Sequence, residues 1–120
     1  MPIANLKLLR QSFRYALRGI RYAWKHEQNF RIQSLIAGGV IILSLMLQVK
    51  PWEATTLLLV IATVLGLELA NSIFEKLADI LQPRIHDYVK VMKDLMAAAV
   101  LGASILAVAI GLIIFVPYFI

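Results

Sequence analysis

Three long apolar runs limit what this chain can fold into. They cover residues 32–49, a stretch that begins near Ala54, and residues 95–116. About 20 apolar residues in a helix cross a hydrocarbon layer about 30 Å thick. Backbone N–H and C=O groups find no water in that layer, so a crossing segment must bond its own backbone as a helix. The sequence therefore predicts an all-α membrane protein, and its 61% content of hydrophobic residues fits this class.

No linker or internal repeat divides the 120 residues, so we expect a single domain covering residues 1–120. The first apolar run begins only at Ile32, behind a long basic segment. We therefore do not expect a cleaved secretory signal peptide. The chain has no cysteine, which excludes disulfides, thiolate metal sites and thiol nucleophiles.

The second run continues further than a membrane span needs. We expect its helix to cover residues 54–82 and to stop before Pro83, which gives a length of about 42 Å. Its last turns must therefore leave the hydrocarbon. A tight turn at 49–53 precedes this helix, and a polar connection at 83–94 follows it. Small residues in the first and third spans predict close helix packing: Ala37, Gly38 and Gly39, then Ala99, Ala103, Ala107 and Gly111.

Residues 5–26 carry two parallel stripes at helical spacing. The apolar stripe consists of Leu6, Leu9, Phe13, Leu17, Ile20 and Trp24. The basic stripe, about 100° further round, consists of Lys7, Arg10, Arg14, Arg18, Arg21 and Lys25. Such a helix can place its apolar side in the head-group region and its cations against lipid phosphates. We therefore expect a helix at the membrane surface and interpret the positive charge as a membrane feature, with no nucleic-acid partner.

The cations also predict an orientation. Seven precede the first span, Lys50 alone lies in the 49–53 turn, and four lie at or after the end of the second span. Positive residues concentrate on the cytoplasmic side of membrane proteins. We therefore expect the N-terminus and the 83–94 connection in the cytoplasm and the C-terminus outside.

The second span carries polar residues where lipid would favour none. At 100° per residue, the four side chains fall within an arc of about 80° on one helix face. They are Glu68, Asn71, Glu75 and Asp79. With the orientation above, Asp79 lies near the cytoplasmic surface and Glu68 lies deeper. The spacing therefore predicts one polar stripe that descends from the cytoplasm into the membrane.

Two more acidic residues, Glu27 and Asp94, lie close to the same surface. Carboxylates gathered there repel one another unless a cation intervenes, and Mg²⁺ with oxygen ligands meets that need. Because Mg²⁺ usually arrives with phosphate, Lys93 and His86 are candidate donors to phosphate oxygens. A carboxylate stripped of water, such as Glu68, suits a general base acting on a hydroxyl. Together these residues predict phosphoryl transfer to an alcohol that resides in the membrane.

Simpler explanations exist for each residue. The Glu68 carboxyl can serve as a hydrogen-bonding group between helices. Others can be ordinary interface or surface residues: Glu75, Asp79, His86, Tyr15 and Trp24. An acidic stripe also suits a small oligomeric proton-coupled transporter that uses Glu68. That alternative explains less well why lysine, histidine and further carboxylates gather on one side. An inactive membrane scaffold would keep only the packing residues.

Several stretches resemble one family. They are SFRYALRGI at 12–20, EQNFR at 27–31, ELANSIFE at 68–75, His86, and KDLMAAAVL at 93–101. In this order they resemble the prokaryotic diacylglycerol kinase family, small bacterial membrane lipid kinases that include the undecaprenol kinases. The resemblance covers nearly the whole chain. Its central pattern, Glu-x-x-Asn-x-x-x-Glu followed by Lys-Asp, is specific to this group.

The resemblance implies a homotrimer in the bacterial inner membrane, with active sites shared between subunits. It implies ATP as co-substrate, Mg²⁺ as cofactor, and diacylglycerol or undecaprenol as the lipid substrate. Glu68 would then be the general base, steadied by Asn71, and Glu27 and Glu75 would hold Mg²⁺ on the ATP phosphates. The remaining candidates would bind or lie near the nucleotide: Lys93, Asp94, His86, Tyr15 and Asp79.

Some residues depart from the family pattern. Ile73 and Phe74 are bulkier than usual, and we expect both to face away from the polar stripe. Leu8 stands where some members have an arginine, for which Arg10 or Lys7 is a candidate substitute. The stretches QPRIH at 82–86 and GLIIFVP at 111–117 are more similar to members that prefer undecaprenol.

Overall fold

The computed structural model describes residues 5–82 and 86–120, and these ranges form four helices joined by short connections. The helices are α1 (Leu6–His26), α2 (Gln28–Leu47), α3 (Pro51–Leu81) and α4 (His86–Phe119). Helices α2, α3 and α4 are long and apolar enough to cross a membrane. The all-α fold with three candidate spans that the sequence predicts is therefore confirmed.

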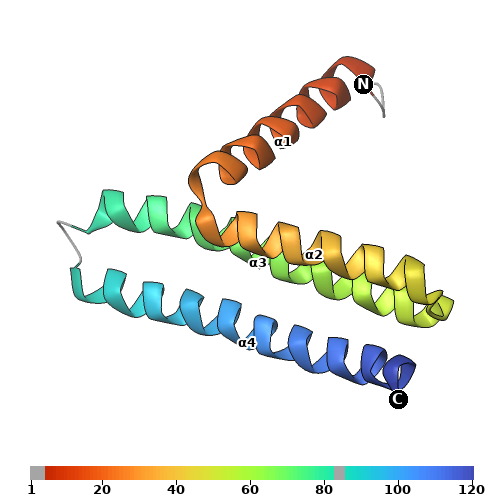
Figure 1. The fold of residues 1–120 in the computed structure, drawn as a ribbon. Helices are drawn as coiled ribbons and strands as arrows, with labels where there is room; N and C mark the ends of the chain where they lie inside the picture. The colour runs from red at the N-terminus through yellow and green to blue at the C-terminus, as the bar shows by residue number, and fades with distance from the viewer. Residues whose placement is uncertain (1–4, 83–85) are drawn as a thin grey trace.

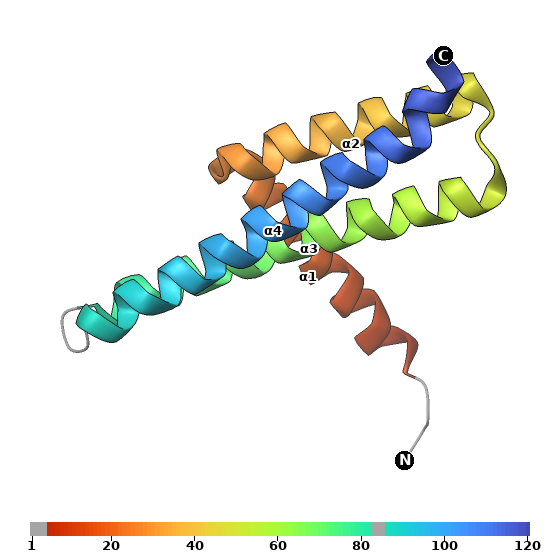
Figure 2. The ribbon, with the colours of Figure 1, turned by 90° about the horizontal axis from the view of Figure 1, so that it is seen from below.

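Helix α3 is the centre of the arrangement. It runs antiparallel beside α4 and also packs against α2 (Figure 1). Seen from below, α4 lies over both α2 and α3 (Figure 2). Helix α1 contacts α2 where the two join and then projects away from the bundle. The end of α3, the start of α4 and the α1–α2 junction lie toward one end, and the α2–α3 connection and the C-terminus lie at the other.

Local capping defines the bounds of α1. The side chain of Asn5 accepts hydrogen bonds from the backbone N–H groups of Lys7, at 3.0 Å, and Leu8, at 3.3 Å. At the other end the helix stops at Glu27, whose backbone is extended, with φ −112° and ψ 106°. One arginine, Arg31, donates from Nη1 to the carbonyl oxygens of Trp24 and Lys25, each at 3.3 Å. The helix predicted for 5–26 is present, and a single extended residue redirects the chain into α2.

The connection between α2 and α3 is shorter than the predicted turn at 49–53. Helix α2 ends at Leu47, and Gln48 takes a left-handed conformation with φ 52°. Helix α3 already begins at Pro51, a position where the missing N–H of proline costs nothing. The Glu53 side chain accepts the backbone N–H of Lys50 at 3.0 Å. Residues 51–53 therefore belong to the helix, because proline and the glutamate cap start it early.

The polar connection predicted at 83–94, with its amphipathic tail, is helical for most of its length. Helix α4 begins at His86, so residues 86–94 form its first turns. Residues 84–94 contain no proline or glycine that would interrupt a helix. Pro83, Arg84 and Ile85 lie outside the described residues. The polar start of α4 consequently lies beside the polar end of α3. The predicted span covered only residues 95–116, so it did not predict this contact.

The glycines expected to bring helices close together do not do so within one chain. Ala37 is buried, but added Cβ atoms at Gly38, Gly39 and Gly111 would meet no atom within 4 Å. Most large apolar side chains on the spans are exposed, for example Leu45, which is 74% exposed. In a bilayer such surface faces lipid or another protein chain. The glycines therefore leave open space beside their helices, and for Gly111 this space is a cavity among α2, α3 and α4.

At the end opposite the junction of α3 and α4, one polar contact ties α3 to α4. The Tyr118 hydroxyl donates to Glu53 Oε1, the same carboxylate oxygen that accepts the Lys50 N–H. Glu53 is buried, at 7% exposed. A buried carboxylate requires such partners, because an unpaired one loses its hydration without compensation.

Removing this contact should destabilise the helical bundle. We expect Tyr118→Phe to lower the midpoint of thermal unfolding in detergent, measured by circular dichroism, because Glu53 loses a donor. Tyr88→Phe is the matched control, since Tyr88 lies on the same helix and is 73% exposed. Equal midpoints for the two variants would show that the contact contributes no stability.

Candidate active site

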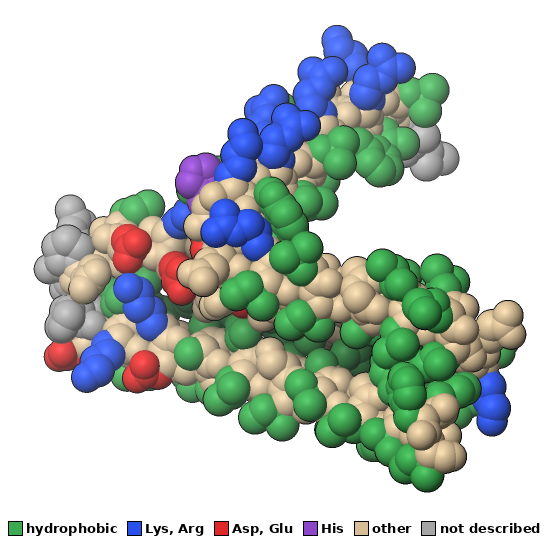
Figure 3. All heavy atoms as spheres, viewed as in Figure 1, with side chains coloured by type: hydrophobic (Ala, Val, Ile, Leu, Met, Phe, Trp, Pro, Cys, Tyr) green, Lys and Arg blue, Asp and Glu red, His purple; other side chains and the backbone are tan. Residues whose placement is uncertain are grey.

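A cavity of about 430 Å³ lies between α3 and α4, and we call it the α3–α4 cavity. Helix α2 contributes one residue to it, Asn29. Its other lining residues are Glu68, Asn71, Phe74, Glu75 and Asp79 of α3, and Lys93, Met96, Ala97, Val100, Leu101 and Ser104 of α4. Figure 3 shows acidic and basic side chains together at the end where α3 finishes and α4 begins. The cavity thus joins a charged end to an apolar wall.

The four residues of the predicted stripe all line this cavity. Their spacing places them on one face of α3, and helical geometry spreads Glu68 to Asp79 over about 16 Å of its axis. The amide of Asn71 donates from Nδ2 to Glu75 Oε1 at 3.4 Å, one turn further along. The shared face that the sequence predicts is therefore present.

Glu68 is the buried member of the stripe, at 2% exposed. Within residues 5–82 and 86–120, its Oε2 atom has no hydrogen-bond partner, and neither has the buried Oε1 atom of Gln33. The side chain of Gln33 lies within hydrogen-bonding reach of the Glu68 carboxylate. Glu75 and Glu27 are close enough to repel the Glu68 carboxylate electrostatically. An unpaired buried carboxylate is costly, and natural proteins place such groups mainly at functional sites.

Lys93 and Asp79 form an ion pair across the mouth of the cavity, with Lys93 Nζ 3.2 Å from Asp79 Oδ1. The pair exists because α4 is helical from His86, which brings Lys93 level with the end of α3. Asp94, the next residue, is exposed and does not line this cavity. Lys93 therefore places a cation at the mouth of the cavity, where it could contact a phosphate.

Glu27 lies on a different side of α3. It lines a second cavity of about 700 Å³, the α1–α3 cavity, together with Tyr22 and Lys76. Lys76 Nζ lies 3.7 Å from Glu27 Oε1 and 5.0 Å from the centre of the Tyr22 ring. Within one chain, Glu27 and Glu75 therefore do not line the same cavity, and Glu27 has a cation partner of its own.

Two candidates remain, Tyr15 and His86. Tyr15 is on α1, 61% exposed, with the Arg18 guanidinium carbon 5.7 Å from the centre of its ring. His86 is the first residue of α4, and its side chain lies outside the described part of the chain. Tyr15 does not line the α3–α4 cavity.

The structure adds residues that sequence reasoning missed. Asn29 lines the α3–α4 cavity from the first turn of α2, and the only signal for it was an amide at the start of an apolar helix. Phe74 was expected to face away from the polar stripe, but it lines the same cavity. That expectation was wrong because Phe74 lies three positions after Asn71, which places it at the edge of the same helix face. Ile73 does face away, at 68% exposed, and lines the α1–α3 cavity.

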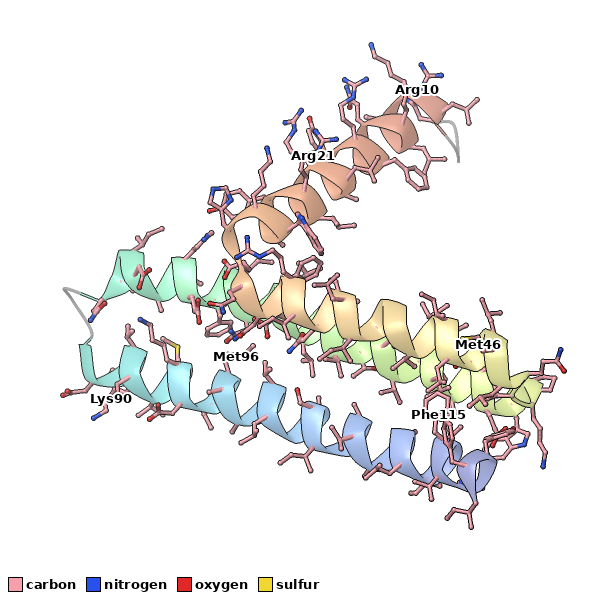
Figure 4. All side chains as sticks on the ribbon, in the orientation of Figure 1. Arg10, Arg21, Met46, Lys90, Met96 and Phe115 are labelled. Carbon is pink, nitrogen blue, oxygen red and sulfur yellow. The ribbon has the colours of Figure 1, made fainter. Side chains whose placement is uncertain are left out.

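The inner part of the cavity is apolar. Met96 lies on the side of α4 that faces α3, whereas Lys90 points away from it (Figure 4). Beyond Ser104, which lines both spaces, an apolar cavity of about 410 Å³ lies among α2, α3 and α4. Phe115 is part of its wall (Figure 4). A hydrocarbon chain would therefore find apolar walls next to Glu68.

The donor set suits Mg²⁺ delivered with phosphate better than a resident metal ion. In the ranges that the structure describes, no three or more His, Asp or Glu side chains cluster to hold a metal. Mg²⁺ commonly uses one or two carboxylates and completes its shell with waters and substrate phosphates. Glu75, which has no cation partner among the ion pairs of these ranges, fits that pattern.

Comparison with known proteins decides the family. Residues 14–115 match the family described as prokaryotic diacylglycerol kinase. The chain belongs to this family. The resemblance inferred from the sequence is thus confirmed, and the family is one of lipid kinases.

Two relatives are named for two lipid alcohols. The chain is 36% identical to a diacylglycerol kinase of Synechocystis sp. over 107 residues, which is 88% of this chain and 61% of that protein. It is 32% identical to an undecaprenol kinase of Bacillus subtilis over 107 residues, 89% of this chain and 87% of that protein. The match thus spans less than two thirds of the Synechocystis protein.

The burial of the Glu68 carboxylate should affect the thermal stability of the protein. We expect Glu68→Gln to raise the midpoint of thermal unfolding, because a neutral amide removes repulsion from Glu75 and Glu27 and is cheaper to bury. Glu75→Gln, at an exposed carboxylate, should change the midpoint less. A lower midpoint for Glu68→Gln would mean that the folded protein already stabilises this carboxylate.

Proposed function

We propose that this chain is an ATP- and Mg²⁺-dependent lipid kinase that phosphorylates the hydroxyl of a membrane alcohol, diacylglycerol or undecaprenol. The observation that carries the proposal is the buried carboxylate of Glu68, whose Oε2 atom has no hydrogen-bond partner in the described residues, in a cavity with one charged end and one apolar wall. Membership of a lipid kinase family and the names of the two relatives support it.

The reaction is a direct transfer. The lipid hydroxyl oxygen forms a bond to the γ-phosphorus of ATP, and the bond between that phosphorus and the bridging oxygen of ADP breaks. The hydroxyl proton passes to the Glu68 carboxylate, and ADP leaves. Glu68 suits this step because no hydrogen bond occupies its Oε2 atom. Asn71 is one turn along the same face and holds Glu75 at 3.4 Å, which orients the charged end beside the base.

The apolar wall of the cavity suits the lipid. Phe74, Met96 and Leu101 line it beside Glu68, and the apolar cavity beyond Ser104 extends the same surface. An alcohol with a hydrocarbon chain along this wall presents its hydroxyl to the carboxylate without leaving an apolar environment. This geometry favours a membrane alcohol over a water-soluble one.

The charged end suits the nucleotide. Mg²⁺ bound to ATP offsets the charge of the phosphate oxygens, and Glu75 would hold it through a carboxylate oxygen. Lys93 would donate to a phosphate after exchanging its contact with Asp79, a surface pair whose net strength is small. Asp79 stays beside the exchanged lysine. Both residues lie at the mouth of the cavity. Asp79 lies about 16 Å from Glu68 along the α3 axis.

Three candidates do not line this cavity in one chain: Glu27, Tyr15 and Asp94. The side chain of a fourth, His86, lies outside the described part of the chain. We propose that the protein is a homotrimer in which a neighbouring copy completes the nucleotide and metal site with some of these residues. The exposed apolar surface of the spans supports further helix contacts. Glu27 would act as second Mg²⁺ ligand after separation from Lys76.

The proposed location is the bacterial inner membrane, with the N-terminus and the site in the cytoplasm and the C-terminus outside. The excess of cations near α1 and the start of α4 supports this orientation, since Lys50 is the only cation of the α2–α3 connection. ATP is then available on the side where the charged end of the cavity opens.

A lipid phosphorylation assay tests the function. Purified protein in detergent with labelled ATP and Mg²⁺ should phosphorylate diacylglycerol or undecaprenol, and parallel rates on the two alcohols would identify the substrate. Nucleotide should also raise the thermal midpoint, since a ligand that binds the folded state stabilises it. No labelled lipid from either alcohol, together with no effect of ATP on the midpoint, would reject the kinase.

The role of Glu68 gives a sharper test. We expect Glu68→Gln to lower kcat by about 10²- to 10⁴-fold, the usual contribution of a general base, while ATP still stabilises the protein. Asp87→Asn is the control, because Asp87 is an exposed carboxylate on α4 that does not line the cavity. Turnover of Glu68→Gln close to that of the control would exclude the proposed base.

Glu75 is tested through the metal. We expect Glu75→Gln to raise the Mg²⁺ concentration that gives half-maximal rate by about tenfold or more, because one ligand oxygen loses its charge. The measurement is a Mg²⁺ titration of the rate at fixed ATP, beside the Asp87→Asn control. An unchanged Mg²⁺ response with a reduced rate would assign Glu75 a role other than metal binding.

A further inference from the structure

Lys76 follows Glu75 on α3 but contacts a different part of the molecule. Its Nζ atom lies 3.7 Å from Oε1 of Glu27, the extended residue between α1 and α2. The side chain of Glu27 is 19% exposed, whereas that of Lys76 is 52% exposed. A carboxylate with so little access to water needs a cation or a donor beside it. In residues 5–82 and 86–120, Lys76 is the cation that forms an ion pair with Glu27.

Tyr22 gives Lys76 a second contact on α1. The Nζ atom lies 5.0 Å from the centre of the Tyr22 ring, within the range of a cation–π interaction. The ring is stacked on that of His26, with ring centres 4.2 Å apart, and His26 Nδ1 lies 3.0 Å from the Tyr22 carbonyl oxygen. Lys76 therefore keeps an attractive contact with α1 if Glu27 takes another partner.

The Glu27 carboxylate belongs to a group of three acids. Glu27 and Glu75 both lie close enough to Glu68 to repel its carboxylate. Like charges held together in this way favour the binding of a cation. Of the three, Glu27 is the one that forms an ion pair with a lysine in the described ranges. Lys76 therefore offsets part of the repulsion while no metal is bound.

A metal ion and Lys76 compete for Glu27, because two cations at one carboxylate repel each other. Free Mg²⁺ would have to displace Lys76 and also lose part of its own water shell, which it does reluctantly. Mg²⁺ that arrives with ATP brings phosphate oxygens, and the displaced ammonium group can pair with them. Lys76 therefore opposes free Mg²⁺ more strongly than Mg²⁺ that is bound to ATP.

We propose that Lys76 is a positioning residue that holds Glu27 in the empty protein and keeps free Mg²⁺ from this carboxylate until the nucleotide binds. The inference rests on the proposed function, in which Glu27 is a ligand of the Mg²⁺ that accompanies ATP. It adds an order of binding, with the metal entering together with the nucleotide. An ion pair that only fastened α1 to α3 would have no such effect on metal affinity.

Manganese binding without turnover tests this order. Mn²⁺ is a suitable probe because it prefers the same oxygen ligands as Mg²⁺, and electron paramagnetic resonance measures the fraction that stays free. Without nucleotide, we expect Lys76→Met to bind Mn²⁺ about tenfold more tightly than the parent, the scale on which neighbours of a ligand alter metal affinity. A non-hydrolysable ATP analogue should make this difference smaller. Lys90→Met is the matched control, since Lys90 is exposed on α4 and points away from α3 (Figure 4).

Further variants assign the effect to the charge and to Glu27. Lys76→Arg keeps the charge and can hold the carboxylate with two N–H groups, so it should bind Mn²⁺ no more tightly than the parent. Combining Glu27→Gln with Lys76→Met should remove the added affinity. Lys76→Gln, which also removes the charge, serves in the same titration if Lys76→Met does not fold. Equal affinity of Lys76→Met and the parent, a gain that Lys76→Arg shares, or a gain that survives Glu27→Gln would overturn the inference.

The parent protein separates this inference from the proposed function. A parent that binds no Mn²⁺ with the ATP analogue and phosphorylates neither lipid rejects the kinase, and the role of Lys76 with it. A parent that phosphorylates lipid, while Lys76→Met leaves the Mn²⁺ affinity unchanged, rejects the role of Lys76 alone.

Discussion

The structure depends on one property of hydrocarbon, which leaves a peptide group without a hydrogen-bonding partner. Every crossing segment is consequently helical, and length that exceeds the layer must leave it. Helices α3 and α4 have 31 and 34 residues, or about 46 and 51 Å, against a layer of about 30 Å. The connection from α2 to α3 is short and closed by Glu53 and Tyr118, so the excess length emerges at the other end. That is where the polar turns of both helices meet and form the cavity.

The same physical property explains why Glu68 is the unusual residue. It lies level with Gln33, about 8 Å along α2 from Gln28, and so within the span rather than at its end. A carboxylate there loses hydration, and its Oε2 atom has no hydrogen-bond partner in the described residues, which opposes folding. Under the proposed function, its place at the inner end of the cavity would give a lipid hydroxyl direct access to it. Stability and function therefore make opposite demands at this position.

Periodicity alone predicted much of the site. Glu68, Asn71, Glu75 and Asp79 share a face because helical geometry relates positions three and four apart, whatever the neighbours are. The motif around them also identified the family. The contacts of these residues could not be predicted in the same way. Lys93 reaches Asp79 only because α4 is helical from His86, and Lys76 reaches Glu27 only because the chain turns at one extended residue. Such pairs depend on how separate helices pack, which residue spacing does not encode.

The sequence by itself determined that three segments are long and apolar enough to span a membrane, that a basic helix precedes them, and that one face of the second span is acidic. These follow from local properties, namely hydropathy, helical period and charge. Only the tertiary structure decided that Asn29 and Phe74 line the cavity, that Glu27 and Glu75 lie in separate cavities within one chain, and that the basic side of α1 faces away from the spans. These depend on the angles and offsets between helices, which arise from side-chain packing across elements that are distant in sequence.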